Sequence, residues 1–160
     1  MMNNINDKIQ FKKTINSYLL EIKEFIGTDI TPNLLSSRED MEEIRNKSYV
    51  LNDLEKLNFV MNFDLRKSKR FKQFIANLDK ANNRPVYIWT EKSNVCGLYK
   101  ASSIKAINFS FKFDVNDDGM VIFLTEDCND RLLLDFYIDY KERKMLDLEV
   151  KGKNWFSVPF

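Results

Sequence analysis

The chain of 160 residues has no histidine and only four glycines. Without histidine it lacks the usual general base at neutral pH, the Ser-His and Cys-His nucleophile arrangements, and the donor of most zinc sites. The glycines are too few and too scattered to build a phosphate-cradling loop of the P-loop or Rossmann type. We therefore expect a protein that is not an enzyme and that holds no cofactor or metal.

Cysteines and long hydrophobic runs are also scarce. Cys96 and Cys128 are too few for a disulfide framework and form no Cys-x-x-Cys pair, so both are expected to be buried thiols. No apolar run approaches the ~18 residues that span a bilayer. The first residues lack the basic and apolar segments of a signal peptide. These features predict a cytoplasmic protein that does not enter a membrane.

Aromatic residues, by contrast, are abundant: 13 Phe, 6 Tyr and 2 Trp, in a chain that is 44% hydrophobic. This composition is well above the range of disordered proteins, and the length fits one domain over residues 1–160. The formal net charge is only +1, which argues against an extended phosphate-binding surface.

Up to about residue 82, apolar residues recur three or four positions apart, the spacing of helices that bury one face. A helix is predicted from about residue 5 to 26, with Gly27 as its C-cap. A second helix is expected to begin after Ser37, an N-cap followed by acids in the first turn. The same spacing predicts two further helices, a third with Leu54, Leu57, Val60 and Met61 and a fourth, from near Ser68, with Phe71, Phe74, Ile75 and Leu78.

From residue 84 onward, apolar and polar residues alternate or form short apolar runs, as in β-strands. Strands are predicted at 86–90, 95–100, 107–113, 120–125, 132–139 and 146–151. Six strands with short links favour an antiparallel meander. The fold class is therefore α+β, with the helices of residues 5–82 packed on one face of the sheet of residues 84–160 and the other face open to water.

A local excess of acid lies within this β half. Residues 114–139 carry eight carboxylates, with Lys112 just before the stretch and Arg131 inside it as the only nearby cations. Complementary charge steers encounters and selects partners. The excess therefore predicts a surface that meets a basic partner.

The predicted hairpin of strands 132–139 and 146–151 makes this expectation more specific. Keeping the apolar residues of both strands on one face requires an odd loop around Lys141–Arg143. Two registers satisfy this requirement, and they set Asp135 opposite either Glu149 or Asp147. Either pairing places two carboxylates face to face, at a cost of up to about 1 kcal/mol. The pair is either a binding surface with Tyr137 as an aromatic anchor, or a solvated face whose repulsion is screened.

Residues 114–119 match the opening D-x-N-x-D-G of a calcium loop. The match ends there, because the twelfth position is Thr125 where the motif needs a bidentate Glu. The other interpretation is a hairpin loop in which Asn and Asp side chains bond their own backbone and Gly119 supplies a positive φ. Calcium remains the lesser alternative for this loop.

A basic segment, residues 66–72, competes with the acidic surface as a functional feature. Five cations stand close together there, and Phe71 and Phe74 lie among them. A nucleic-acid-binding helix that depends on Lys69 and Arg70 is the alternative function. The two phenylalanines share a stripe with Ile75, so they are more often core than a stacking platform. At the C-terminal end, Trp155 and Phe156 are expected to fold back and cap the core.

Several short segments carry a resemblance to a known group: Pro85–Thr90, Gly97–Tyr99, Asp117–Gly119, Leu132–Tyr137 and Gly152–Trp155, preceded by short helices. In this layout, residues 84–160 resemble bacterial immunity proteins of polymorphic toxin systems, in particular those of contact-dependent growth inhibition. The resemblance implies a small cytoplasmic protein that binds the toxic domain of a cognate effector, commonly a basic nuclease, and blocks it.

The acidic surface fits that role independently, because an acidic protein surface can occupy the basic cleft of a nuclease. The expected function is thus an immunity or inhibitor protein that binds a toxin through its acidic loop and outer sheet face. The residues expected to contact the partner are Asp117, Asp118, Glu126, Asp127, Asp130, Asp135, Tyr137, Asp139, Asp147 and Glu149.

Overall fold

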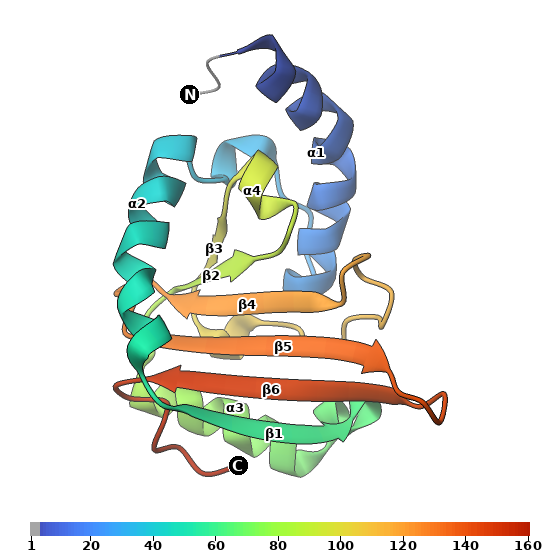
Figure 1. The fold of residues 1–160 in the computed structure, drawn as a ribbon, viewed down its shortest axis with the longest axis vertical. Helices are drawn as coiled ribbons and strands as arrows, with labels where there is room; N and C mark the ends of the chain where they lie inside the picture. Colours follow the sequence, from blue (N-terminus) through green and yellow to red (C-terminus); the bar gives the residue numbers. More distant parts are fainter. Residues whose placement is uncertain (1–3) are drawn as a thin grey trace.

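An antiparallel sheet of six strands crosses the middle of the protein in the computed structural model, which describes residues 4–160 (Figure 1). The strands lie in the order β1-β6-β5-β4-β2-β3, so β1 joins the edge beside β6 and β4 pairs with β2. Their bounds are Lys56–Asn62 (β1), Val86–Trp89 (β2), Tyr99–Ala101 (β3), Met120–Thr125 (β4), Asp130–Ile138 (β5) and Lys144–Gly152 (β6).

The helices come mostly before the sheet, as predicted, and their ends carry the expected caps. Gly27 ends the first helix in the left-handed region at φ 80°. Ser37 accepts a hydrogen bond from the Asp40 amide, and Ser68 accepts one from the Phe71 amide. The helices are Ile5–Ile26 (α1), Arg38–Ser48 (α2), Lys69–Ala81 (α3) and Ser93–Cys96 (α4), with 3-10 turns at Pro32–Leu34 (η1), Tyr49–Asp53 (η2), Phe63–Lys67 (η3) and Ile104–Ala106 (η4). The α+β class is confirmed.

The predicted third helix is wrong, because residues 56–62 form strand β1. Leu57, Phe59 and Met61 alternate along the inner face, where they pair with the buried Val150, Leu148 and Leu146 of β6. Val60 belongs to the opposite, outer face of the same strand. A helix would have buried Leu57 and Val60 together, but the sheet separates them because its side-chain period is two.

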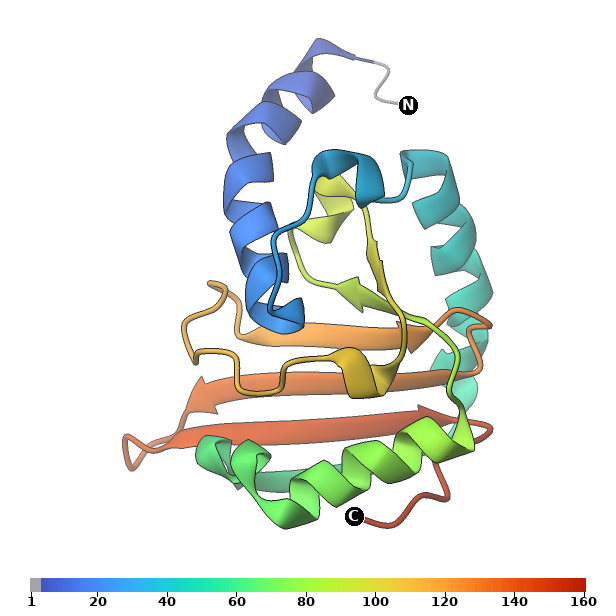
Figure 2. The ribbon, with the colours of Figure 1, turned by 180° about the vertical axis from the view of Figure 1, so that it is seen from behind.

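The predicted strand at 107–113 is also wrong. Phe111 is buried, and Phe109 and Phe113 are half-buried against the core, but the backbone takes an irregular path across the inner face of the sheet (Figure 2). The guanidinium of Arg66 donates hydrogen bonds to the carbonyl oxygens of Phe109 and Phe111. A side chain therefore satisfies backbone groups that a strand would pair with a neighbour.

The main core lies on the inner face of the sheet. Helix α3, the segment 104–113 and the second half of α1 cover that face (Figure 2). Phe71 and Phe74 are fully buried there, which confirms their assignment to the core. Trp155 is also fully buried and donates from Nε1 to the Leu78 carbonyl at 3.0 Å, so it caps the core as expected. Phe156 is only half-buried and is not part of that core.

The outer face of the sheet is open over only part of its area. Helix α2 and η2 cover the ends of the strands near the start of β5 and leave the ends near the β5–β6 hairpin bare (Figure 1). A small second core forms under α2 from Met41, Ile44, Leu51, Leu98, Leu124 and Cys128. Cys96 and Cys128 are both free and buried, as predicted. Among the residues described, no helix is long and apolar enough to cross a bilayer.

Candidate functional site

The candidate site lies on the bare part of the outer sheet face, and strand register creates it. β5 and β6 are joined by a five-residue loop and pair so that Asp135 faces Asp147. This is one of the two registers that the sequence allowed. Because cross-strand partners share a face, Asp135 and Asp147, here called the acidic pair, project side by side.

Charges are segregated along the outer face. The register sets Arg131 of β5, Lys151 of β6 and Lys56 of β1 in one row across the sheet, near η2. The next row on this face contains Leu133 and Glu149, and the row after it contains the acidic pair. Met120 of β4 and Val60 of β1 flank the acidic pair in that third row. Tyr137, Met145 and Asn62 form the row beyond it.

The three cations of the first row, here called the basic row, are all engaged by groups of the protein itself. Glu149 lies 3.2 Å from an Arg131 nitrogen and 3.4 Å from Nζ of Lys56. Asn52 of η2 accepts from Arg131 through its side chain and from Lys151 through its carbonyl oxygen, at 3.2 and 3.1 Å. Glu149, one of the residues expected to contact a partner, is thus already engaged by two cations.

The acidic pair has no comparable compensation. Within residues 4–160 no cation lies within ion-pair distance of Asp135 or Asp147. Burial, and then the charge of Asp147, raise the pKa of Asp135. The Tyr137 hydroxyl donates to Asp147 at 3.0 Å, and this hydrogen bond raises the pKa of Tyr137. The structure thus brings together three of the predicted residues, and two of them repel each other.

The surroundings of the acidic pair are largely apolar and half-buried. Met120 lies on one side of the pair, and Tyr137 and Met145 lie toward the hairpin. Two carboxylates between methionine and tyrosine side chains suit a lysine or arginine of a partner, whose alkyl stem contacts the apolar atoms while its charge meets the acids. The arrangement can therefore bind a cationic side chain.

The acids of the β4–β5 turn are held by internal contacts. Glu126 forms an ion pair with Lys100 at 2.9 Å. Asp127 lies 3.2 Å from Arg84 and accepts from Thr125 Oγ1 and the Asn129 amide. Burial alone raises the pKa of Asp127, but these hydrogen bonds outweigh burial and lower it. Both side chains are half-buried, and they shape the turn.

The prediction that Asp130 contacts a partner is wrong, because this residue is fully buried. Its carboxylate accepts hydrogen bonds of 2.7–2.9 Å from the Asn82 side chain, the backbone and side chain of Asn154, and the Trp155 amide. It therefore ties the end of α3 and the C-terminal segment to the start of β5. A partner has no access to it.

The Asp139 carboxylate is likewise held by internal contacts, in this case within the β5–β6 hairpin. It accepts from the amides of Lys141 and Arg143 and from the Arg143 guanidinium, at 2.7–2.9 Å. Hydrogen bonding, first of all from the Arg143 amide, lowers the pKa of Asp139. This carboxylate therefore fixes the odd loop that sets the strand register.

The loop before β4 lies beside the acidic pair. Asp117 and Asp118 are exposed, and the Gly119 carbonyl accepts from the Phe136 amide at 2.8 Å, next to Asp135. Asn116 accepts from the Gly119 amide at 2.9 Å, and Gly119 has a φ of 65°. The expected turn chemistry is thus confirmed. Among the residues described, no three acids, cysteines or histidines are grouped so as to hold a metal ion.

The basic segment 66–72 is not a continuous surface. Arg66 is only 3% exposed, lies over the rings of Phe63 and Phe111, and donates to three backbone carbonyls. Burial lowers its pKa to about 10. Arg70 bonds the Phe160 carbonyl oxygen at 3.0 Å. Arg66, Phe71 and Phe74 are thus buried and cannot contact a nucleic acid, which weakens the nucleic-acid alternative.

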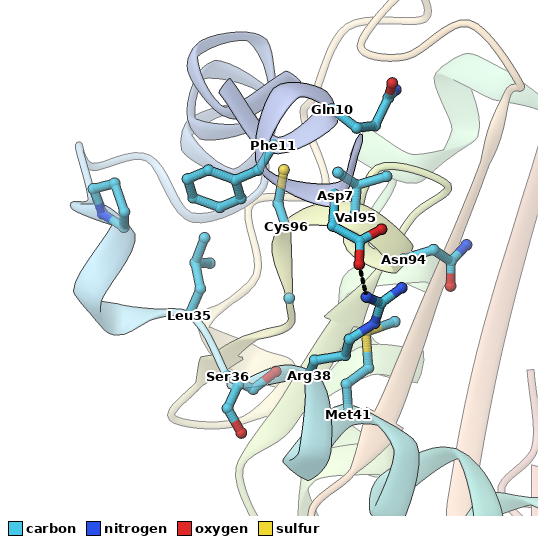
Figure 3. A pocket seen from close by; sticks show the side chains of 13 residues that line it. Asp7, Gln10, Phe11, Leu35, Ser36, Arg38, Met41, Asn94, Val95 and Cys96 are labelled. Atoms are coloured by element: carbon cyan, nitrogen blue, oxygen red, sulfur yellow. Dashed lines mark hydrogen bonds and ion pairs between the residues drawn. The ribbon is translucent and has the colours of Figure 1, made fainter. Parts of the chain in front are cut away.

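Two features escaped the sequence analysis. A cavity of about 240 Å³ opens between α1, α2 and α4; Phe11, Leu35 and Cys96 line it, and the Asp7–Arg38 ion pair bridges it (Figure 3). Burial raises the pKa of the Cys96 thiol to about 11, so this sulfur is a poor nucleophile. Elsewhere on α1, the buried Glu21 pairs with Lys92 at 3.2 Å. Both features join residues far apart in sequence, and no local pattern indicates them.

Comparisons with known proteins identify no relative of this chain. No protein-family model, no curated protein and no solved structure matches it. A role for the chain therefore rests on the chemistry of its outer sheet face.

Proposed function

We propose that this protein binds and neutralises a basic protein partner through the acidic pair and the residues around it. The observation that carries the proposal is the pairing of Asp135 with Asp147 on a bare sheet face, with Tyr137 as the only hydrogen-bond donor to the pair within the described residues. A lysine or arginine of a partner would relieve the repulsion between the two carboxylates. Internal contacts hold five other predicted acids, namely Glu126, Asp127, Asp130, Asp139 and Glu149. The acidic pair and the exposed Asp117 and Asp118 are left to meet a partner.

The partner that fits best is the toxic domain of a bacterial polymorphic toxin, of a basic, nuclease-like kind. The resemblance of residues 84–160 to immunity proteins supports this choice, and so does the ability of an acidic surface to block a cleft that binds nucleic acid. Asp117 and Asp118 extend the acidic surface beyond the Tyr137 end of the sheet. In this proposal the protein acts by occupying the cleft and has no catalytic step.

The proposal is tested by co-expression with the C-terminal domain of whichever protein is encoded immediately upstream of this chain. Growth should be restored by the wild-type chain and lost again with Asp135→Lys/Asp147→Lys. With the purified toxin domain, the same variant should associate about tenfold more slowly and show a weaker dependence on salt. The measurement is the association rate at several ionic strengths.

A matched control changes the same amount of charge elsewhere. Glu42 and Glu43 are exposed residues of α2, away from the proposed surface, and each forms only a surface ion pair within that helix. Glu42→Lys/Glu43→Lys should therefore protect cells like the wild type. The assignment of the surface fails if the acidic-pair variant binds and protects as well as the control. The immunity role fails if the upstream domain is harmless to cells that lack this chain.

A further inference from the structure

The two edges of the sheet differ in how well they are covered. At one edge, β3 has only three residues, and the segment before α2 lies against it: Leu35 bridges to Tyr99, and the Ser36 amide donates to the Leu98 carbonyl at 2.9 Å. At the other edge, β1 has seven residues and, within residues 4–160, pairs with β6 alone. One side of its backbone is therefore left without a strand partner.

β1 also lacks the features by which proteins protect an edge strand. Such edges are usually short, or carry several charges, a proline or a bulge. β1 has no proline, runs in unbroken register with β6 from Lys56 to Asn62, and carries a single charge, at its first residue. Lys56 is itself paired with Glu149. This edge can accept another strand.

Exposed apolar side chains gather around the same edge. Among the large hydrophobic residues that the structure leaves exposed, five fall within residues 49–65. Val60 is 64% exposed on β1 itself. Leu54 precedes the strand, Leu65 follows it in η3, and Tyr49 and Val50 lie in η2. A cluster of this kind beside an open edge is typical of an interaction surface.

We propose that the occupant of this edge is a second copy of the chain, with the two β1 strands pairing antiparallel about a two-fold axis at Phe59. In this register all seven residues of each strand pair: Lys56 faces Asn62 of the second copy, Leu57 faces Met61, and Asn58 faces Val60. No two like charges meet. The inner faces of the two sheets join into one continuous face, because paired residues keep the same side.

The flanking residues complement this register. Antiparallel pairing brings the start of one β1 beside the end of the other, so Leu54 of one copy lies near Leu65 of the second. Lys56 faces Asn62 of the second copy, and Asp64 follows Asn62 by two residues at the start of η3, so opposite charges lie at the same end of the pairing. At the axis, the two Phe59 rings meet, and each is already supported by Phe160, at 4.9 Å between ring centroids, and by Phe74. The register thus opposes Leu57 to Met61 and leaves no like charges face to face.

The dimer is independent of the proposed function, because it forms without a toxin. Light scattering after size exclusion, over a range of protein concentrations, should show a dimer for the wild-type chain. Asn58→Lys/Val60→Lys should give a monomer, because each new lysine then faces another across the axis. Within its own chain each new lysine faces an acid of β6, Glu149 or Asp147, so the fold should be retained, and circular dichroism checks this.

The control Ile138→Lys/Tyr140→Lys adds the same charge at exposed positions near the hairpin and should leave the dimer intact. A wild-type chain that is monomeric at every concentration overturns the proposal, and so does a dimer that survives Asn58→Lys/Val60→Lys.

Hydrogen exchange of the wild-type chain gives a second test that needs no variant. Amides of residues 56–62 that point away from β6 should become protected as the concentration rises. Protection that does not change with concentration excludes β1 as the dimer edge.

Discussion

Asp135 lies in β5, and Asp139 lies four residues later, just after the strand ends. The fold nevertheless shifts the pKa values of these two carboxyl groups in opposite directions. Asp135 is opposed by Asp147, and its pKa is raised; Asp139 is surrounded by donors, and its pKa is lowered. Composition cannot distinguish them. Strand register places Asp135 opposite Asp147, which costs stability. Loop geometry surrounds Asp139 with hydrogen-bond donors, so that this residue stabilises the hairpin.

The first prediction concerns Asp135→Asn. A raised pKa means that the folded state holds the proton more tightly than the unfolded chain, so ionisation costs stability, and this cost grows as the pH rises through the two pKa values. The substitution should increase the free energy of unfolding at neutral pH by about 0.5 kcal/mol, a value reduced for solvent screening. The gain should vanish below about pH 4. Urea unfolding of variant and wild type at both pH values measures it.

Asp139→Asn should have the opposite sign. The lowered pKa means that the charged form is stabilised in the folded state; this contribution is present above the ordinary pKa of Asp and is lost as the pH falls through the lowered one. The variant should therefore be less stable than the wild type at neutral pH, and the difference should shrink in acid. Equal effects of the two substitutions would contradict the distinct roles assigned to these carboxylates.

At the scale of elements, the sequence was informative where one local pattern decides the structure. The helical stripe and Gly27 predicted α1, and the alternation in β5 and β6 restricted the hairpin to two registers. β1 was missed because its few apolar residues also fit a helical spacing, and only pairing with β6 decides between the two. The segment 107–113 was missed because alternation reports burial on one side and does not show that a neighbouring strand is present.

The irregular segment 107–113 should depend on Arg66. This side chain holds the carbonyls of Phe109 and Phe111 and is almost fully buried. Arg66→Ala leaves these carbonyls without their charged donor and should lower the free energy of unfolding by about 3 kcal/mol. Hydrogen exchange should become faster in residues 107–113 than in β5. Unchanged exchange there would show that packing alone holds the segment.

Asp130 should act as a junction between elements. Asp130→Ala removes the acceptor of four donors from Asn82, Asn154 and Trp155, so the free energy of unfolding should fall by about 3 kcal/mol or more. Asp117→Ala, in an exposed loop, serves as the control and should be close to neutral. The two unfolding curves in urea are compared. A small effect at Asp130 would mean that water replaces the carboxylate.

At the scale of the whole molecule, the outer face separates its charges into a basic row, whose cations are held by Glu149 and Asn52, and an acidic pair that has no cation beside it. Alternation in the sequence indicated this face and the pairing of two acids on it. The inward position of Asp130 could also have been read from its parity with Leu132, Leu134 and Phe136. The cations beside Glu126, Asp127 and Glu149 could not be predicted from the sequence, because they come from distant elements that only the tertiary structure brings close.

The most direct test of the acidic pair is an NMR titration of the ¹⁵N-labelled protein with a short peptide that alternates lysine with apolar residues. The predicted result is a set of amide shifts centred on Asp135, Tyr137 and Asp147 that extends to Met120 and Met145 and disappears in Asp135→Asn/Asp147→Asn. Shifts of similar size around the exposed acids of α2, or shifts that persist in the double variant, would contradict the proposed binding surface.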